Sequence, residues 1–150
     1  MASDTIDTLN KLVEASKDGE FGFRDAAEKA KSPDLQHTFR QHADECRQGA
    51  TELQALVSQL GGTAENGGTM SGAAHRGWMA VKGGVTGYTD LAILEECERG
   101  EDSAMKSYRE ALDGELPATA RALVERQYEG VKRNHAQVRA LRDTARAAAR

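Results

Sequence analysis

The sequence is short of the residues that favour sheets, break helices or build disulfide frameworks. Its 150 residues include two cysteines and two prolines, and only 5% of them are aromatic. Two cysteines exclude a disulfide-rich secreted scaffold. With few aromatic residues and prolines, 29% charged residues and many alanines, the composition favours helices over sheets. We therefore expect a single all-α domain over residues 1–150, long enough to bury a core.

Long hydrophobic runs and long basic runs are absent as well. No stretch of about 18 apolar residues is present, so we expect no transmembrane helix. The start, MASDTIDTLNKLVEA, has neither the basic nor the apolar region of a signal peptide. The net charge is −4 and no basic cluster stands out, which argues against nucleic acid as a partner. We expect a reduced, cytoplasmic, bacterial-type protein that binds neither nucleic acid nor membrane.

What the sequence does contain is apolar spacing at alternating intervals of three and four, the pattern of one helix face. In the first segment this stripe is Ile6, Leu9, Val13, Ser16, Glu20, Phe23, Ala27 and Ala30, and in the second it is Leu35, Phe39, His42, Cys46, Gly49, Leu53, Leu56 and Leu60. Ser32 suits the N-cap of the second helix, and Pro33 suits its first position. Two further helices are predicted over residues 88–113 and 117–147.

The link between the second and third helices is long and rich in glycine. Residues 61–72, GGTAENGGTMSG, predict a loop, and residues 73–82 predict a short helix. The turns inside each pair of helices are short, so both pairs form antiparallel hairpins. A link over residues 61–87 is long enough to run the length of a bundle. The sequence therefore predicts a ferritin-like four-helix bundle, made of two antiparallel hairpins joined by one crossover.

Polar residues interrupt the stripes at mid-bundle. Aligning the two hairpins places Glu20, His42, Glu101 and Gln127 in one layer, with Glu98 one turn from Glu101 and Glu45 one turn from His42. Buried carboxylates are costly unless they are neutralised, paired or bound to a metal. Facing glutamates beside a histidine predict a divalent metal site, and Fe(II), Mn(II) or Zn(II) would suit these ligands.

The same residues can be interpreted without a metal. Glu20 and Glu101 lie at a stripe edge, from which a carboxylate reaches solvent or an arginine. His42 suits a hydrogen-bonded core histidine. Cys46 and Cys97 suit small buried hydrophobic residues, although a His/Cys/Cys/Glu set would also accept zinc.

Two stretches carry a resemblance to a known family. HRGWMAVKGG (75–84) and LEECERGEDSAMKSYREAL (94–112) resemble an uncharacterised bacterial family of ferritin-like four-helix bundles, a domain of unknown function, over about residues 5–147. Its ErGEd signature is matched here by Glu98, Gly100, Glu101 and Asp102, followed by Tyr108. The resemblance implies a ferritin-like fold and a bacterial origin, and it implies no reaction.

The wider ferritin-like superfamily implies a set of metal ligands that this sequence matches in part. Proteins of that superfamily supply a glutamate from helices 1 and 3, a role that Glu20 and Glu101 would fill. Helices 2 and 4 supply Glu-x-x-His, and here these motifs read Glu45-Cys-Arg-Gln48 and Glu129-Gly-Val-Lys132. Both histidines are replaced, so the resemblance implies a mononuclear or degenerate site at Glu20, His42 and Glu101 in place of a di-iron centre.

Two functional hypotheses follow from these patterns. The first is a bundle that binds a divalent metal through Glu20, His42 and Glu101, with Glu98 and Glu45 in support, and that acts in metal handling or stress. The alternative is a metal-free interaction or assembly protein that acts through its helical surface, for example as a homodimer. No nucleophile motif or dinucleotide fingerprint is present, so whether the chain is an enzyme depends on the metal alone.

Overall fold

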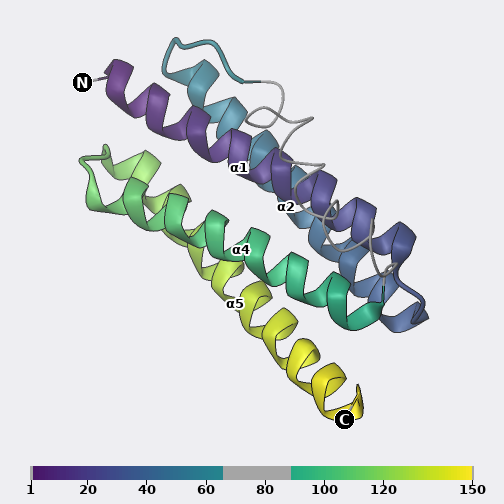
Figure 1. The fold of residues 1–150 in the computed structure, drawn as a ribbon. Coiled ribbons are helices and arrows are strands. Elements are labelled where there is room, and N and C mark those ends of the chain that lie inside the picture. Colours follow the sequence, from purple (N-terminus) through teal and green to yellow (C-terminus); the bar gives the residue numbers. More distant parts are fainter. Residues whose placement is uncertain (1, 66–88, 150) are drawn as a thin grey trace.

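The computed structural model describes residues 2–65 and 89–149, and these residues form four long helices (Figure 1). They are α1 (Ala2–Lys29), α2 (Pro33–Gln59), α4 (Asp90–Asp113) and α5 (Ala118–Ala149). The all-α class and the four predicted helices are therefore confirmed, with the third and fourth helices starting within two residues of their predicted starts. The short helix predicted at 73–82 lies outside the described residues.

The two ends of α2 follow from its sequence. Ser32 has extended backbone angles, and its hydroxyl accepts a hydrogen bond from the backbone N–H of Leu35, which confirms the predicted N-cap. At the other end, Gly61 has a φ of +83°, and the N–H groups of Gly61 and Gly62 donate to the carbonyls of Ser58 and Val57. This is a Schellman motif, which requires a left-handed residue that glycine adopts without strain.

Hydrogen bonds join the start of α4 to the turn between α1 and α2. The Thr89 hydroxyl caps α4 by accepting from the N–H of Ala92 at 3.1 Å. The Asp90 carboxylate accepts from the backbone N–H groups of Lys31 and Ser32, at 2.8 and 3.1 Å. This one side chain therefore joins the second hairpin to the turn of the first.

The two hairpins pack side by side with one tight joint and one loose joint. In Figure 1, α1 runs antiparallel to α2, and α4 runs antiparallel to α5. The hairpins meet mainly through α1 and α4, whereas α2 and α5 approach each other at only a few points. Because α2 and α4 run in the same direction, the link between them has to cross the length of the bundle, which is the single-crossover arrangement predicted from the sequence.

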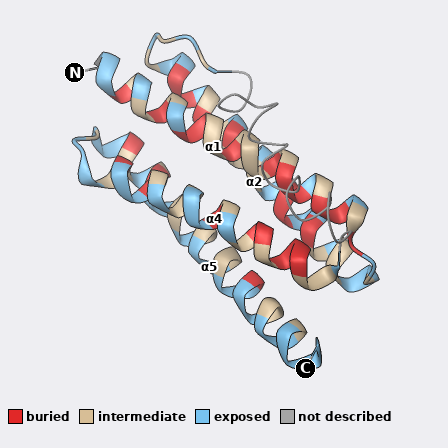
Figure 2. Ribbon diagram, viewed as in Figure 1, coloured by how far each residue is buried: buried red, intermediate tan, exposed pale blue. Residues whose placement is uncertain are grey.

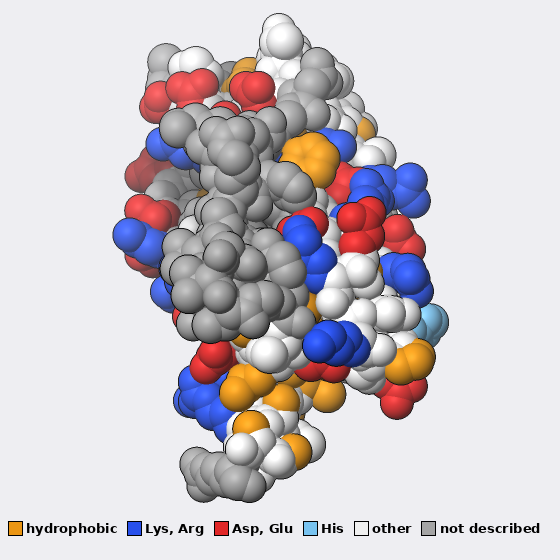
Figure 3. All heavy atoms as spheres, turned by 45° about the vertical axis from the view of Figure 1, so that its right-hand side comes forward, with side chains coloured by type: hydrophobic (Ala, Val, Ile, Leu, Met, Phe, Trp, Pro, Cys, Tyr) orange, Lys and Arg blue, Asp and Glu red, His pale blue; other side chains and the backbone are white. Residues whose placement is uncertain are grey.

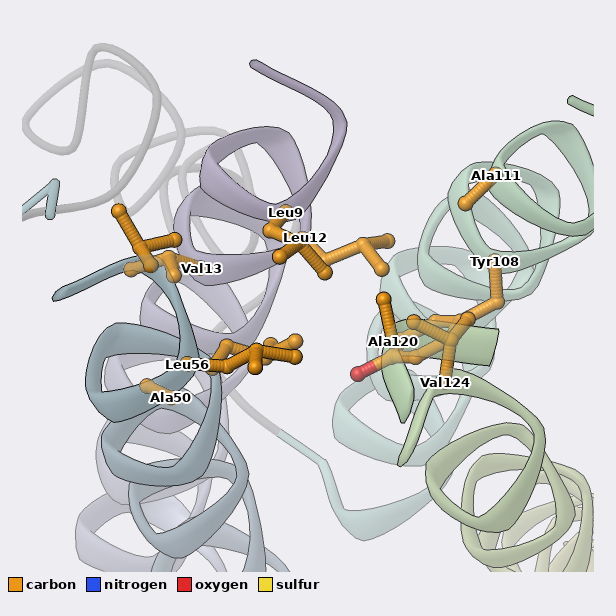
Figure 4. Close-up of a cluster of buried hydrophobic side chains, with 11 residues drawn as sticks. Leu9, Leu12, Val13, Ala50, Leu56, Tyr108, Ala111, Ala120 and Val124 are labelled. Carbon is orange, nitrogen blue, oxygen red and sulfur yellow. The ribbon is translucent and has the colours of Figure 1, made fainter. Parts of the chain in front are cut away.

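Apolar side chains gather in two clusters, one toward each end of the bundle. Figure 2 marks the buried residues of the four helices in red. The first cluster contains Leu9, Leu12, Leu53, Leu56, Tyr108 and Val124 among others, and Figure 4 shows labelled side chains from all four helices pointing toward one another there. The second is built around Phe23, Phe39, Ile93, Leu94, Cys97 and Val138. Both clusters contain residues of all four helices, so both hold the two hairpins together.

The face drawn in Figure 3 carries side chains of both charges together with hydrophobic ones. On the face drawn in Figure 3, acidic and basic side chains alternate over the described part of the bundle. None of the described helices is long and apolar enough to cross a membrane.

Candidate binding cavity

A cavity of about 890 Å³ lies between the two hydrophobic clusters, and all four helices line it. Each helix contributes one glycine to its wall: Gly19, Gly49, Gly100 and Gly130. Glycine inside a helix is less favourable than alanine by roughly 0.5–1 kcal/mol, so four such positions weaken the helices that they interrupt. Because these positions carry no side chain, the middle of the bundle stays hollow while both ends are packed.

Glu101 is the buried carboxyl group of this cavity. Its residue is 5% exposed, and its Oε1 atom has no hydrogen-bond partner among the described residues. Burial, together with the nearby negative charges of Asp102, Glu45 and Glu98, raises the pKa of Glu101 to about 9. An unpartnered buried acceptor is costly, and the residue that carries it lines the cavity.

Cys46 and Cys97 occupy different surroundings near Glu101. Cys46 lines the cavity, and a Cβ atom on Gly19 would lie only 2.8 Å from its Sγ, so the two helices touch at this point. Cys97 is fully buried in the second cluster, as predicted for a small hydrophobic residue. Burial and the charge of Glu101 raise the pKa of both thiols, and both cysteines are free. Each is therefore a protonated thiol at neutral pH.

The loose joint between α2 and α5 is bridged by polar side chains. His42 is hydrogen-bonded through Nε2 to Oε1 of Gln137 at 2.7 Å, and Asn134 donates to Glu45 at 2.6 Å. Further along, the amide of Gln127 donates to the Glu52 carboxylate at 3.0 Å and to the Gly49 carbonyl at 3.1 Å. Arg126 pairs with the same carboxylate at 3.1 Å. These contacts succeed one another along two antiparallel helices, so they form a ladder across the joint.

Two glycines of the cavity wall lie within this ladder. On α2, Gly49 lies between Glu45 and Glu52, which both carry bridges, and on α5 Gly130 lies between the bridging residues Gln127 and Asn134. A Cβ atom on Gly49 or Gly130 would meet its nearest neighbour at an ordinary distance of 3.6 Å. The Gln127 amide lies against Gly49 and the Arg133 guanidinium against Gly130, so these side chains cover the two glycines at this part of the wall.

The sequence-predicted ligands do not all reach the cavity. Glu101 and Glu45 line it. Glu20 is 5% exposed but pairs with Arg24 at 2.9 Å and with Lys17 at 3.6 Å on its own helix. Glu98 forms an ion pair with Arg142 of α5. Glu20 and Glu98 therefore already have basic partners, as the interpretation without a metal expected of Glu20.

His42 is buried, as its place in the stripe predicted, and it packs inside the first hairpin. Its ring lies edge-on to Phe23, with ring centroids 4.9 Å apart. Burial lowers the pKa of His42, and this effect is larger than the opposing effects of the hydrogen bond to Gln137 and of the charge of Glu45. The ring is therefore neutral at pH 7. Its Nδ1 atom has no hydrogen-bond partner among the described residues.

The predicted level of Gln127 in the polar layer is wrong. His42 faces Gln137 across the bundle, ten residues further along α5 and so about 15 Å away at the helical rise. Gln127 instead accepts a hydrogen bond from the Tyr108 hydroxyl at 2.8 Å. The error arose because the stripes repeat with every helical turn. Aligning them by this period therefore leaves open a shift of one or more whole turns between the two hairpins.

The described residues do not reproduce a ferritin-type metal centre. Among them, no three His, Cys, Asp or Glu side chains are arranged to hold a metal ion. Two of the five predicted ligands, Glu101 and Glu45, line the cavity, and Glu45 also accepts from Asn134. Metal binding by the predicted set therefore stays a prediction.

The cavity was not predicted, although the sequence carries a signal for it. Each of the four helices has at least one glycine well inside it, and one glycine of each helix lines the cavity, whereas Gly22 of α1 does not. Glycine that recurs inside otherwise strong helices indicates that space or close approach is needed there. That signal would also have drawn attention to their neighbours Cys46, Glu101 and Gln127.

Comparisons with solved structures show the fold. A point variant of Dps1 from Mycobacterium smegmatis superposes with a TM-score of 0.79 at 18% identity, over 94% of this chain and 96% of that chain. The bacterioferritin-related protein of Bacteroides fragilis, described as a dodecameric thioferritin, gives a TM-score of 0.77 at 16% identity, over 98% of this chain and 89% of that chain. At these identities the likeness shows a ferritin-like bundle and nothing of the chemistry. No curated protein matches the sequence.

The family follows from the sequence. Residues 4–114, most of the chain and including the Glu101 signature, match the family model described as "Domain of unknown function (DUF2383)". The match ends at the C-cap of α4, so it spans α1, α2 and α4. The chain is a ferritin-like four-helix bundle that belongs to the DUF2383 family.

Proposed function

We propose that this protein binds a positively charged ligand in the mid-bundle cavity, with Glu101 as the anchoring carboxylate. The observation that carries the proposal is the unpartnered Oε1 atom of Glu101, which belongs to a residue only 5% exposed in the wall of an 890 Å³ cavity. A buried acceptor of this kind is stabilised by a ligand that supplies a donor or a positive charge. Residues of both apolar clusters line the cavity, so the ligand would lie between the two clusters.

A divalent metal is the form of this ligand that the sequence predicted. Glu101 and Glu45 are the two predicted ligands in the cavity wall, and oxygen ligands suit Fe(II), Mn(II) or, less selectively, Zn(II). Water would have to complete the coordination, because Glu20 and Glu98 are engaged by basic residues. Metal retained by the purified protein would support a role in metal handling or stress.

Cation binding is tested with three proteins and one panel of ligands. The proteins are the wild type, Glu101→Gln, and Glu98→Gln as the matched control, which alters a carboxylate one turn away that pairs with Arg142. The panel is Mn(II), Zn(II), anaerobic Fe(II) and a set of small organic amines, measured by isothermal titration calorimetry. We expect at least one cation whose affinity falls roughly tenfold or more in Glu101→Gln and is kept in Glu98→Gln.

Two outcomes would overturn this proposal. The first is that no member of the panel binds the wild type. The second is that binding occurs with the same affinity in all three proteins, which would place the ligand away from Glu101. Circular dichroism of each variant separates a lost site from a lost fold.

Self-association is the second candidate function, and the dodecameric assembly of the Bacteroides fragilis relative supports it. In this form the bundle acts through its helical surface, as a homodimer or a larger assembly, and needs no metal. Sedimentation velocity over a range of concentrations tests it. A monomer at all concentrations would exclude self-association as the function.

A further inference from the structure

We propose that the ligand of the cavity is an organic ammonium ion with an apolar body, whose nitrogen lies against Glu101 and whose body fills the space between Phe23 and Tyr108. This inference rests on the proposed function and names the chemical class of its ligand. It is carried by the size of the cavity, by the aromatic groups at its two ends and by the balance of charge in its wall.

The cavity is too large for a metal ion alone. A divalent ion with six waters occupies about 180 Å³, taking about 30 Å³ for each water. The cavity measures about 890 Å³, which is within the range of roughly 300–1,000 Å³ found for sites of small organic molecules. An ion held at Glu101 would leave most of this space to water, whereas an organic ligand would use it.

The two ends of the cavity are aromatic. Phe23 lines it and belongs to the second hydrophobic cluster, and Tyr108 lines it and belongs to the first. Both side chains are almost fully buried, at 2% and 3% exposure. Glu101 lies on the same helix as Tyr108, two turns before it, so the carboxylate stands between the two rings along the bundle. Aromatic faces bind both apolar groups and organic cations.

The charge of the wall favours a cation over an anion. Among the described residues, the acidic side chains of the lining are Glu14, Asp18, Glu45, Glu52 and Glu101, and the basic ones are Lys11, Arg126 and Arg133. Arg126 is paired with Glu52 at 3.1 Å, so its charge is neutralised within the wall. Because its pKa is about 9, Glu101 keeps its proton in the empty cavity near pH 7. An ammonium group would stabilise the ionised form and so bind with release of that proton, whereas a ligand carboxylate would oppose the ionisation.

Three probes of similar shape separate these contributions. Tryptamine carries an ammonium group on an indole body, tryptophol replaces it with a hydroxyl, and indoleacetate carries a carboxylate. We expect tryptamine to bind the wild type roughly tenfold or more tightly than tryptophol in calorimetry, and indoleacetate not to bind. In Glu101→Gln the preference for tryptamine over tryptophol should disappear.

A second variant tests whether binding depends on the volume of the cavity, separately from the charge of Glu101. Ala104 lies in the wall, one turn from Glu101 and one from Tyr108. Ala104→Leu keeps a strong helix former and fills part of the cavity. We expect it to weaken tryptamine roughly tenfold or more. A bare metal at Glu101 would be indifferent to this change, so Mn(II) titrated into the same variant is the control.

The outcomes distinguish this inference from the function on which it rests. If Mn(II) binds in a manner that needs Glu101 while tryptamine does not bind, the organic ligand is excluded and cation binding stands. If tryptophol binds as tightly as tryptamine, the ligand is not a cation. If neither amines nor metals bind, both proposals are overturned. Melting temperatures of both variants verify that each one is folded.

Discussion

At the scale of single residues, carboxyl groups of one chemical kind have very different surroundings in this bundle. Glu20 is buried beside Arg24 and Lys17, and Glu98 is paired with Arg142 across the hairpin. Glu101 has an oxygen without a partner in the part of the chain that the structure describes. For the first two glutamates, nearby positive charge offsets the cost of burial. Within residues 2–65 and 89–149, Glu101 forms no ion pair, and its pKa rises to about 9 because of burial and negative neighbours.

We expect Glu101→Gln to stabilise the empty protein by an amount that grows with pH. The pKa of Glu101 is about 9 in the folded protein and about 4.5 in the unfolded chain, so the unfolded chain loses this proton first as pH rises. Between these values the free energy of unfolding of the wild type falls by about 1.4 kcal/mol per pH unit, because the folded state binds more protons. A glutamine, which has no proton to lose, removes this loss.

Urea denaturation of both proteins at about pH 5 and about pH 8 measures this effect. The two should be nearly equal in stability at the lower pH, and the variant should gain several kcal/mol at the higher one. Other titrating groups, including His42, are common to both proteins and cancel in the difference. A gain of the same size at both pH values would mean that Glu101 is already ionised in the fold.

The apolar stripes predicted many of the buried residues, although they missed Leu12 and Val57, and they did not predict what the buried residues contact. Glu20, His42 and Glu101 were each placed on an inward face, and each is at most 5% exposed. Their partners could not be read from the period, because a choice such as Arg24 for Glu20 depends on side-chain reach within one helix. Glu96 shows the same limit: it is buried at 5% exposure beside Arg99, and the stripe did not single it out.

At the scale of helices, two glycines that both line the cavity, Gly130 and Gly19, have different neighbours. A Cβ atom on Gly130 would meet the Arg133 guanidinium at 3.6 Å, which is ordinary contact. On Gly19 it would lie 2.8 Å from the Cys46 Sγ, closer than real atoms approach. Gly130 therefore has room for a methyl group, whereas Gly19 allows α1 and α2 to touch.

We therefore expect opposite effects from the same substitution at these two glycines. Gly130→Ala should raise the free energy of unfolding by roughly 0.5–1 kcal/mol, since alanine is the better helix former and nothing has to move. Gly19→Ala should lower it, because the clash with Cys46 exceeds that gain. Thermal denaturation followed by circular dichroism compares them. Adding Cys46→Ala to Gly19→Ala should recover stability, and no recovery would show that the clash lies elsewhere.

At the scale of the whole molecule, the bundle has two packed ends and a hollow middle. Leu53 in the first cluster and Ile93 in the second are both fully buried, whereas Val131 in the cavity wall is only partly buried. The cost of truncating a side chain to alanine follows how tightly its surroundings are packed. The two ends should therefore carry the stability, and the middle should carry little of it.

Alanine substitutions at these three positions test that distribution. We expect Leu53→Ala and Ile93→Ala each to cost about 2–5 kcal/mol in urea denaturation. Val131→Ala should cost less than about 1 kcal/mol, because its side chain already faces open space. A cost at Val131 as large as at Leu53 would mean that the middle of the bundle is packed in solution.

At this scale the fold could be predicted from the sequence, but the cavity could not. Helix lengths, the cap at Ser32 and the long link were enough to predict two hairpins and one crossover, and the structure and its Dps and bacterioferritin-related neighbours confirm that arrangement. The register between the hairpins was not predicted, as Gln127 showed. That register depends on contacts between helices far apart in the sequence, and the cavity is a product of it.

The attachment of Asp90 to the turn at Lys31 and Ser32 has a consequence for the order in which the chain folds. Each hairpin closes over a turn of a few residues, so its helices meet at small entropic cost. Docking the hairpins at Asp90 instead closes a loop of 59 residues, which costs about 4 kcal/mol of chain entropy before any cross-hairpin contact repays it. Non-local contacts of this kind slow folding. The hairpins would therefore form early and independently, and their docking, which also creates the cavity, would be the rate-limiting event.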